Sequence, residues 1–311
     1  MHIFMTGVTG YIGNEVARAL LNHAHTLTVL VRTQKDAERL QALGYRPVIG
    51  DMHFPKAWQA EAAAADALIH TAQVRAGQRG DETWVRAAQE ADTVAFRGMM
   101  EAARTGRRCR ALIYTSGVAV VGDHGEAWVD EHTPPAPGAI GRYHLAGEQL
   151  VKEARQQGLP ALALRPGLPY GLGGTFEAFF LAEAAKRNFI YVGDGENFQP
   201  TVHLADLAQA YTLALEKCPA GEVINLVDDE PLRMRELGKI LLDAFAGGKV
   251  IGVPLEAFAH QAGGAVAETA AGSYRARNAK AKALLGWQPR FPTFREGIKD
   301  IIAEYKRRNH R

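Results

Sequence analysis

The stretch MHIFMTGVTGYIGNEVARALLNHAHTLTVLVR, residues 1–32, reads as a buried strand, a glycine turn, an amphipathic helix and a second strand. The strands are expected at residues 2–6 and 26–31. In the turn, Gly7 permits the sharp exit from the first strand, Gly10 lets backbone amides approach a pyrophosphate, and Gly13 lets the helix pack closely on the sheet. Because the N-terminal N–H groups of such a helix attract phosphates, the stretch predicts a dinucleotide-binding site. The alternative is a glycine-rich turn without a ligand.

The size and charge of the chain limit its class. With 311 residues, 47% of them hydrophobic, it can bury one large α/β core or two unequal ones. The formal net charge of +2 and the lack of a basic stripe argue against a nucleic-acid partner. The cluster Lys306-Arg307-Arg308 is expected to be a solvated helix end.

The cysteines and the N-terminus point to an ordinary cytoplasmic protein. Cys109 and Cys218 show no paired spacing, so we expect neither a disulfide framework nor a metal site. The first strand starts at residue 2, which leaves no room for a signal peptide. No apolar run approaches the roughly 18 residues of a membrane span. We therefore expect a soluble, cytoplasmic protein without a membrane partner.

The order of the predicted elements favours an α/β fold. Strands are predicted at 2–6, 26–31, 46–49, 67–70, 111–115 and 161–164, and helices at 34–43, 57–65, 81–105 and 142–157. Such alternation is typical of a Rossmann-type doubly wound parallel sheet that binds ligands at the carboxyl ends of its strands. Further on, a strand at 223–227 is expected to return to the sheet, and helices are predicted at 232–246, 256–261 and 278–307. We predict a dinucleotide-binding domain at 1–165 and a smaller, mainly helical substrate domain at 166–311.

Further motifs along the chain resemble one family. Besides the glycine turn they are Gly50-Asp51, Ile69-His70-Thr71-Ala72, Tyr114-Thr115-Ser116, Arg165-Pro166-Gly167-Leu168-Pro169-Tyr170-Gly171, Val202-His203-Leu204-Ala205-Asp206-Leu207-Ala208 and Leu285-Gly286-Trp287-Gln288-Pro289. Over nearly its whole length the chain resembles the extended or atypical short-chain dehydrogenases/reductases, which include sugar-nucleotide epimerases and dihydroflavonol-type reductases. The resemblance implies a nicotinamide dinucleotide cofactor, and a homodimer formed through the helices at 81–105 and 142–157.

The end of the second strand indicates which dinucleotide binds. NAD enzymes usually place Asp or Glu about 20 residues after the glycine turn. Here the strand ends in Val31-Arg32-Thr33, and Lys35 follows. Arg32 can pair with a 2′-phosphate through charge-assisted hydrogen bonds worth roughly 1.5–3 kcal/mol. We predict NADP(H), with NAD(H) as the alternative if Arg32 is only a solvated residue at a strand end.

The predicted cofactor contacts combine this reasoning with the resemblance. By resemblance, Asp51 and Met52 flank the adenine and Ala72 lines the dinucleotide channel, although Asp51 could instead be a simple turn residue. The full set is Thr6, Gly7, Thr9, Gly10, Tyr11, Ile12, Gly13, Arg32, Asp51, Met52, Ala72, Thr115, His144 and Pro166.

The usual catalytic residues of the family are absent. In the family, a serine works with a Tyr-x-x-x-Lys pair on one helix face; the lysine holds the nicotinamide ribose and lowers the tyrosine pKa, so that the phenol can pass a proton. No tyrosine of this chain has a lysine four positions later. Alignment on Glu148-Gln149-Leu150-Val151 puts Ile140 at the tyrosine position and His144 at the lysine position. Gly117 takes the serine position, and Asp92 stands where the family commonly has Asn.

Three nearby residues are candidates for the missing chemistry: Ser116, Tyr143 and His144. His144 titrates near neutral pH and can hold a ribose hydroxyl, whereas Tyr143 offers a phenol displaced by a quarter turn. The alternatives are a surface position for His144, a packing role for Tyr143 and a backbone contact for Ser116. The predicted substrate contacts are Gln73, Tyr170, Phe176 and His203, with core packing and a backbone hydrogen bond from His203 as their alternatives.

Three functions are compatible with these features. The first is an NADP(H)-dependent oxidoreductase, or an epimerase-like enzyme, that acts on a small carbonyl or hydroxyl substrate with a non-standard active site. The second is a catalytically inactive dinucleotide-binding sensor or regulatory protein. The third keeps the cofactor for non-redox isomerase or lyase chemistry. We favour an enzyme because a complete substrate domain has little use in a pure sensor.

Overall fold

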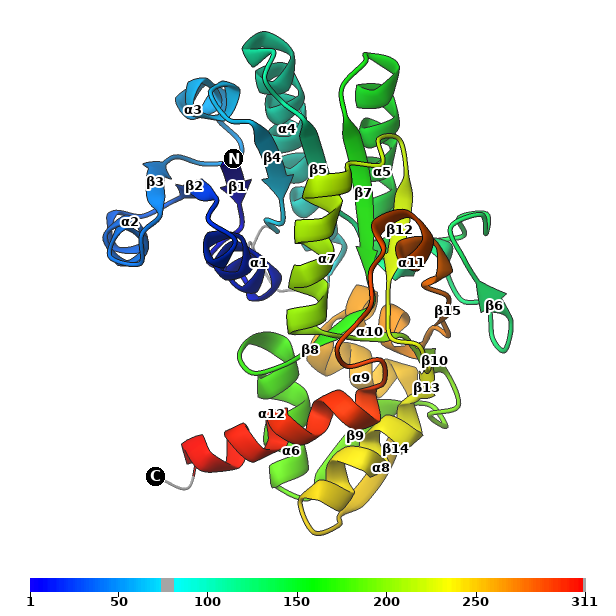
Figure 1. Cartoon of the computed structure of the whole chain (residues 1–311). Coiled ribbons are helices and arrows are strands. Elements are labelled where there is room, and N and C mark those ends of the chain that lie inside the picture. The colour runs from blue at the N-terminus through cyan, green and yellow to red at the C-terminus, as the bar shows by residue number, and fades with distance from the viewer. Residues whose placement is uncertain (74–80, 310–311) are drawn as a thin grey trace.

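The computed structural model describes residues 1–73 and 81–309 and is centred on a parallel sheet (Figure 1). Its seven strands follow the order β12-β7-β5-β4-β1-β2-β3. Their bounds are β1 (His2–Thr6), β2 (Thr26–Val31), β3 (Arg46–Ile49), β4 (Ala67–His70), β5 (Ala111–Thr115), β7 (Ala161–Pro166) and β12 (Val223–Leu226). The predicted Rossmann-type fold class is confirmed.

Helices cover both faces of the sheet because successive strand residues point to opposite sides. Ile3 and Met5 face one core, whereas Phe4 faces the other. The first core is closed by α1 (Tyr11–Asn22), α2 (Gln34–Gln41), α7 (Leu204–Lys217) and α11 (Ala279–Leu285). The second is closed by α3 (Gln59–Ala63), α4 (Glu82–Gly106) and α5 (Ala139–Gln156). Strands that are covered on both faces explain the near-continuous apolar runs in the sequence.

Below the sheet, the rest of the chain builds a smaller unit from short elements (Figure 1). Its helical segments are a π-helix at Phe176–Leu181, α6 (Ala182–Ala185), α8 (Met234–Ala244), α9 (Leu255–Ala262), α10 (Gly264–Ala271) and α12 (Phe294–Asn309). Its strands form pairs, β8 (Leu168–Tyr170) with β11 (Thr201–His203), β9 (Asn188–Val192) with β14 (Lys249–Val253), and β10 (Phe198–Gln199) with β13 (Leu232–Arg233). A last pair joins β15 (Arg275–Ala276) to β6 (Trp128–Val129) of the first half.

Several predicted elements differ in extent. Strand β12 lies beside β7, where the return strand was expected, but the domain boundary at residue 165 stays a prediction. Helix α5 starts at Ala139, earlier than expected, and the helix predicted at 57–65 divides into a 3-10 turn (Pro55–Ala57) and α3. The segment 278–307 holds two helices rather than one, because Gly286 adopts a φ of +63° and ends α11.

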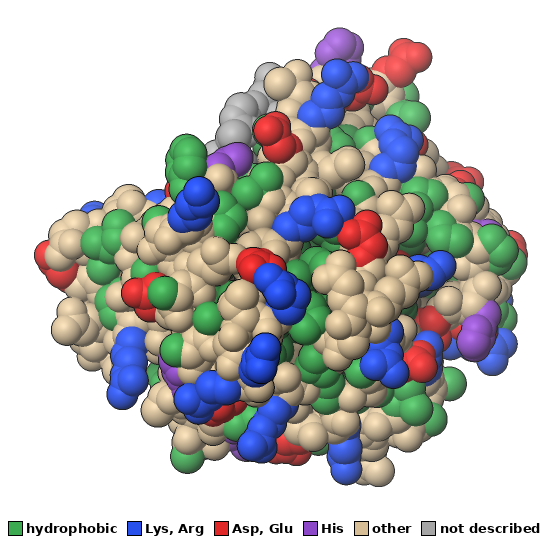
Figure 2. Space-filling model, turned by 90° about the horizontal axis from the view of Figure 1, so that it is seen from above, with side chains coloured by type: hydrophobic (Ala, Val, Ile, Leu, Met, Phe, Trp, Pro, Cys, Tyr) green, Lys and Arg blue, Asp and Glu red, His purple; other side chains and the backbone are tan. Residues whose placement is uncertain are grey.

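The surface carries both signs of charge. Figure 2 shows Lys and Arg side chains interspersed with Asp and Glu over one face, without a continuous basic stripe on that face. In the described ranges, no helix is long and apolar enough to cross a membrane.

Candidate functional site

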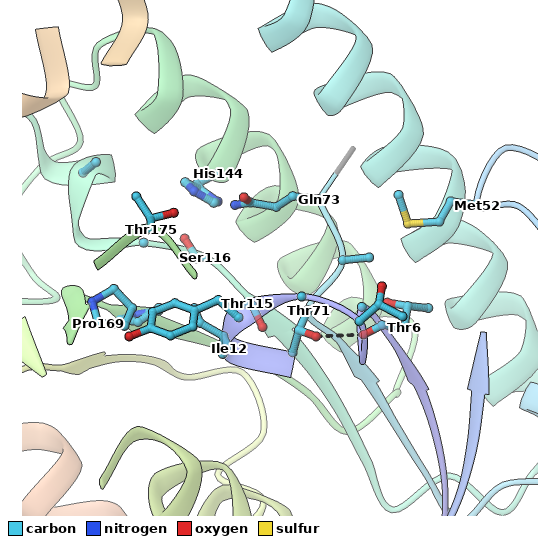
Figure 3. A pocket seen from close by; sticks show the side chains of 18 of the residues that line it. Thr6, Ile12, Met52, Thr71, Gln73, Thr115, Ser116, His144, Pro169 and Thr175 are labelled. Atoms are coloured by element: carbon cyan, nitrogen blue, oxygen red, sulfur yellow. Dashed lines mark hydrogen bonds between the residues drawn. The ribbon is translucent and has the colours of Figure 1, made fainter. Parts of the chain in front are cut away.

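A cavity of about 1030 Å³ lies along the carboxyl end of the central sheet (Figure 3). One part runs over the ends of β1 and β2, and the other reaches the end of β5, helix α5 and the smaller unit. This is where a doubly wound sheet binds its ligands. The sequence-predicted contacts that line it are Thr6, Gly7, Thr9, Gly10, Tyr11, Ile12, Arg32, Asp51, Met52, Ala72, Gln73, Thr115, Ser116, His144 and Pro166.

The glycine turn adopts the geometry that a phosphate cradle requires. Gly7 has a φ of +84°, and a Cβ there would lie 2.5 Å from the backbone nitrogen of Ala72. A Cβ on Gly13 would lie 2.2 Å from the carbonyl oxygen of Gly7, so Gly13 packs α1 on the turn and does not line the cavity. Helix α1 begins directly after Gly10 and has no acidic residue in its first turn. The positive end of its dipole therefore faces the cavity without a competing carboxylate of its own.

Charged groups of both signs stand at the β2 end of the cavity. Arg32 follows β2 and lines the cavity with its neighbour Thr33, which caps α2 by accepting a hydrogen bond from the backbone of Asp36 at 3.1 Å. Asp36 also lines the cavity, and the Thr33 hydroxyl donates to its carboxylate at 2.8 Å. Burial raises the pKa of the Asp51 carboxyl, but hydrogen bonds from His53 and the charge of Arg32 outweigh it, so this pKa lies below its ordinary value.

Ser116 lines the cavity, but its hydroxyl is already engaged in a hydrogen bond. It donates to Glu148 Oε1 at 2.6 Å, and Glu148 forms a bidentate ion pair with Arg165 at 2.7 Å on both arms. Ser116, Glu148 and Arg165 are all buried. The hydroxyl proton of Ser116 is therefore directed away from the cavity, toward a carboxylate.

Tyr143 does not reach the cavity, so its prediction as a relocated acid is corrected. Its phenol donates to Asp92 Oδ1 at 3.1 Å inside a buried network, in which Tyr114 donates to Asp92 Oδ2 at 2.9 Å. His70 joins this network, with Nε2 at 2.8 Å from Asp92 Oδ1 and Nδ1 at 2.7 Å from Thr6 Oγ1. The quarter-turn displacement of Tyr143 on α5 turns it toward α4 instead of the cavity. Asp92 needs several donors because an unpaired buried carboxylate is costly.

His144 reaches the cavity from α5, at the position of the family lysine. Gly117, at the serine position, lies beside the imidazole, and a Cβ there would come within 3.3 Å of His144 Cδ2 and 3.4 Å of Nε2. The ring is buried, and Nδ1 has no hydrogen-bond partner in the described part of the chain. Figure 3 shows the Gln73 side chain pointing toward it.

The protonation of His144 also differs from the expectation of a group that titrates near neutral pH. Burial lowers the pKa of His144 to about 4, although Asp92 and Glu148 act in the opposite direction. The imidazole is therefore neutral at neutral pH and offers one donor and one acceptor. That suits a hydrogen bond to a hydroxyl group and not the role of a proton-donating imidazolium.

Three predicted substrate contacts lie outside the cavity and are corrected. Tyr170 and Phe176 belong to the apolar core of the smaller unit, together with Phe294. His203 caps α7 by accepting a hydrogen bond from the backbone of Ala205 at 3.1 Å. Tyr170 and Phe176 are buried in this core and His203 is partly buried at its cap, roles that a list of aromatic residues does not separate from ligand binding.

The sequence reasoning missed other residues of the cavity wall. They come from α4, from the segment after β5, and from the smaller unit: Trp84, Val118, Ala119, Pro169, Thr175, Gln199, Pro200, Thr269 and Tyr274. Most carry no motif, and Thr269 and Tyr274 lie more than 120 positions after His144, so no local pattern could bring them to it. Among the described residues, no group of three His, Cys, Asp or Glu side chains is placed to hold a metal ion.

The sequence pattern of the NAD dependent epimerase/dehydratase family matches residues 3–226, which is most of the chain. The chain belongs to this family. It is 29% identical over 248 residues to a 4-hydroxy-2-methyl-3-oxo-4-farnesyl-3,4-dihydroquinoline-1-oxide ketoreductase of Stigmatella aurantiaca, covering 78% of this chain and 73% of the relative. It is 30% identical over 264 residues to a 2-alkyl-3-oxoalkanoate reductase of Stenotrophomonas maltophilia, covering 80% and 77%.

Solved structures of other proteins share the fold. The human epimerase family protein SDR39U1 with NADPH superposes with a TM-score of 0.81 at 21% identity, covering 97% of this chain and 99% of that one. A dTDP-glucose 4,6-dehydratase from Bacillus anthracis in complex with NAD gives a TM-score of 0.81 at 17% identity, covering 100% and 98%. The family match confirms the resemblance seen in the sequence, and these structures confirm the predicted fold.

Proposed function

We propose that this protein is an NADP(H)-dependent oxidoreductase that reduces the carbonyl group of a small substrate, or oxidises the corresponding alcohol, with a non-standard active site. The observation that carries the proposal is the continuous cavity. It extends from Arg32 past the glycine turn to Ser116 and His144, and then to a wall supplied by the C-terminal part of the chain. Such a cavity has room for a dinucleotide and for a second molecule beside it.

The residues present fit a nicotinamide dinucleotide. The turn leaves no space for a Cβ at Gly7 or Gly13, and the amino end of α1 is free of acidic residues, which suits a pyrophosphate. Arg32 lines the same cavity and its guanidinium can pair with a 2′-phosphate, and the human protein solved with NADPH supports the phosphorylated form. Asp36 opposes this choice by charge, although Thr33 and Arg39 engage its carboxylate. Bound NADPH would supply a hydride.

Within this proposal, the neutral imidazole of His144 holds the nicotinamide ribose in place of the lysine. The ring lines the cavity and, as a neutral imidazole, offers one donor and one acceptor, which suits a hydrogen bond to a ribose hydroxyl. The names of two relatives, a ketoreductase and an oxoalkanoate reductase, favour a ketone as substrate.

A second candidate function is dinucleotide binding without turnover. It is favoured by the commitment of the Ser116 hydroxyl to Glu148 and of the Tyr143 phenol to Asp92, which removes both from the reacting centre. A protein of this kind would retain the cofactor site and lose the reaction.

Steady-state NADPH consumption separates the two candidates. The assay uses the purified protein, NADPH, and ethyl 2-methylacetoacetate as a ketone probe, with cyclohexanone and benzaldehyde as further probes. We expect NADPH oxidation that depends on the carbonyl compound and is slower with NADH. Saturable NADPH binding with no oxidation on any of the probes would instead support the binding protein and contradict the proposed enzyme.

A further inference from the structure

Thr269 and Tyr274 form one wall of the cavity, and side chains from distant segments hold this wall, residues 268–274, in place. Glu268 accepts a hydrogen bond from the backbone nitrogen of Ala139 at 2.9 Å, at the start of α5. The amide of Gln199 donates to the carbonyl of Gly272 at 3.0 Å, and the Ser273 hydroxyl donates to the carbonyl of Gly125 at 2.6 Å. This wall is therefore fixed to the helix that carries His144.

Tyr274 is the residue of this wall whose side chain can donate a proton. It lines the cavity and belongs to the same buried apolar cluster as Val118 and Val121, which follow Ser116 and Gly117. Its hydroxyl oxygen lies over Gly272, where a Cβ would come within 2.4 Å of it. In the described part of the chain this hydroxyl has no hydrogen-bond partner, although the residue is only 6% exposed. A phenol held in this way is available to a ligand.

Three aliphatic hydroxyl groups of the cavity are already hydrogen-bonded and are less suited to give a proton. Ser116 and Thr115 are paired with Glu148 and Tyr211, at 2.6 Å and 2.7 Å. Thr269 donates to the carbonyl of Ala265 at 2.9 Å. A phenol is a stronger acid than the aliphatic hydroxyl of Thr175. The other phenol of the cavity, Tyr11, has its hydroxyl oxygen fully buried.

We propose that Tyr274 is the proton donor of this active site and replaces, from the wall of residues 268–274, the helix tyrosine that this chain lacks. The inference rests on the proposed reduction. Hydride adds to the carbonyl carbon, the C=O π bond breaks, and the Tyr274 hydroxyl transfers its proton to the resulting alkoxide oxygen. Water then returns a proton to the phenolate. Burial, with Asp123 and Glu268 adding to it, raises the pKa of Tyr274, but an alkoxide is still the stronger base.

The test compares Tyr274→Phe with the wild type on ethyl 2-methylacetoacetate and NADPH. Because the hydroxyl makes no hydrogen bond to the described part of the protein, its removal should leave the fold and the NADPH dissociation constant unchanged. We expect kcat to fall ~10²–10⁴-fold, the usual range for loss of a general acid. Tyr191→Phe is the matched control, because Tyr191 is a buried tyrosine of the same half that does not line the cavity. It should keep the wild-type kcat.

The outcomes separate this inference from the proposed function. Equal kcat values in the wild type and in Tyr274→Phe would overturn the assignment of Tyr274 and leave the reductase standing. No oxidation by the wild type would overturn the reductase and this assignment together. If Tyr274→Phe does not fold, fluorotyrosine incorporated at position 274 takes its place. We expect the alkaline limb of the kcat profile to move to lower pH with this more acidic phenol, and an unmoved limb would overturn the assignment.

Discussion

At the scale of single residues, His144 shows how burial changes the chemistry that a sequence suggests. A free histidine titrates near 6.5, but burial lowers the pKa of His144 to about 4. Between these two values the unfolded chain binds a proton that the folded protein does not. Protonation therefore favours unfolding, and the free energy of unfolding must rise with pH from about 4 to about 6.5.

The contribution of His144 to the pH dependence of stability can be measured with a variant. Urea unfolding of the wild type and of His144→Gln between pH 4.5 and 7 should show a smaller rise in the free energy of unfolding for the variant, which cannot titrate at this position. His203, whose pKa burial also lowers to about 4, is common to both proteins and cancels in the comparison. An equal slope in the two proteins would mean that the imidazole of His144 is not buried in its neutral form.

At the scale of elements, the buried pair of Glu148 on α5 and Arg165 on β7 joins the helix of His144 to the sheet. Glu148→Gln should lower the free energy of unfolding by about 3–5 kcal/mol, because it leaves the buried guanidinium without its counter-charge. Glu153→Gln on the same helix is the matched control. It removes an exposed ion pair with Arg97 and should cost less than about 1 kcal/mol. Chemical denaturation measures the free energy of unfolding of both variants. Equal losses in the two would contradict the stabilising role given to the buried Glu148–Arg165 pair.

The elements also show what the sequence could predict. The buried strands β1, β2, β4, β5 and β7 were predicted closely, because apolar runs bounded by turns leave few alternatives. The paired strands of the smaller unit, such as β8 with β11, were not predicted. They are two to five residues long and pair with partners far along the chain, so no periodicity marks them.

Only part of the candidate site could likewise be predicted from the sequence. The glycine turn and Arg32 could be found because neighbouring residues form that part of the cavity. The wall of Thr269 and Tyr274 could not be found, since Tyr274 joins the apolar cluster of Val118 only through the folded C-terminal segment. The error on Tyr143 arose because helix register gives the rotation of a side chain but not the buried carboxylate of Asp92 that attracts it.

At the scale of the whole molecule, the cavity is lined by residues of both the sheet region and the smaller unit. Its β2 end is formed within the first half, by Arg32 and the residues around Asp51. Its other end needs both halves, since Ser116 and His144 come from one and Tyr274 from the other. In the proposed function, recognition of the 2′-phosphate therefore depends on the first half, whereas the reaction needs both halves, and the two can be tested separately.

The central claim is that the cavity binds NADP(H) and that Arg32 recognises its 2′-phosphate. Calorimetric titration with NADPH and, separately, with NADH tests it on the wild type, Arg32→Ala and Lys35→Ala, whose lysine does not line the cavity. We expect the wild type to prefer NADPH and Arg32→Ala to lose about ten- to a hundredfold in NADPH affinity, with NADH affinity and Lys35→Ala unchanged. Binding of neither dinucleotide by the wild type would contradict the account, and an unaltered preference in Arg32→Ala would remove Arg32 from the site.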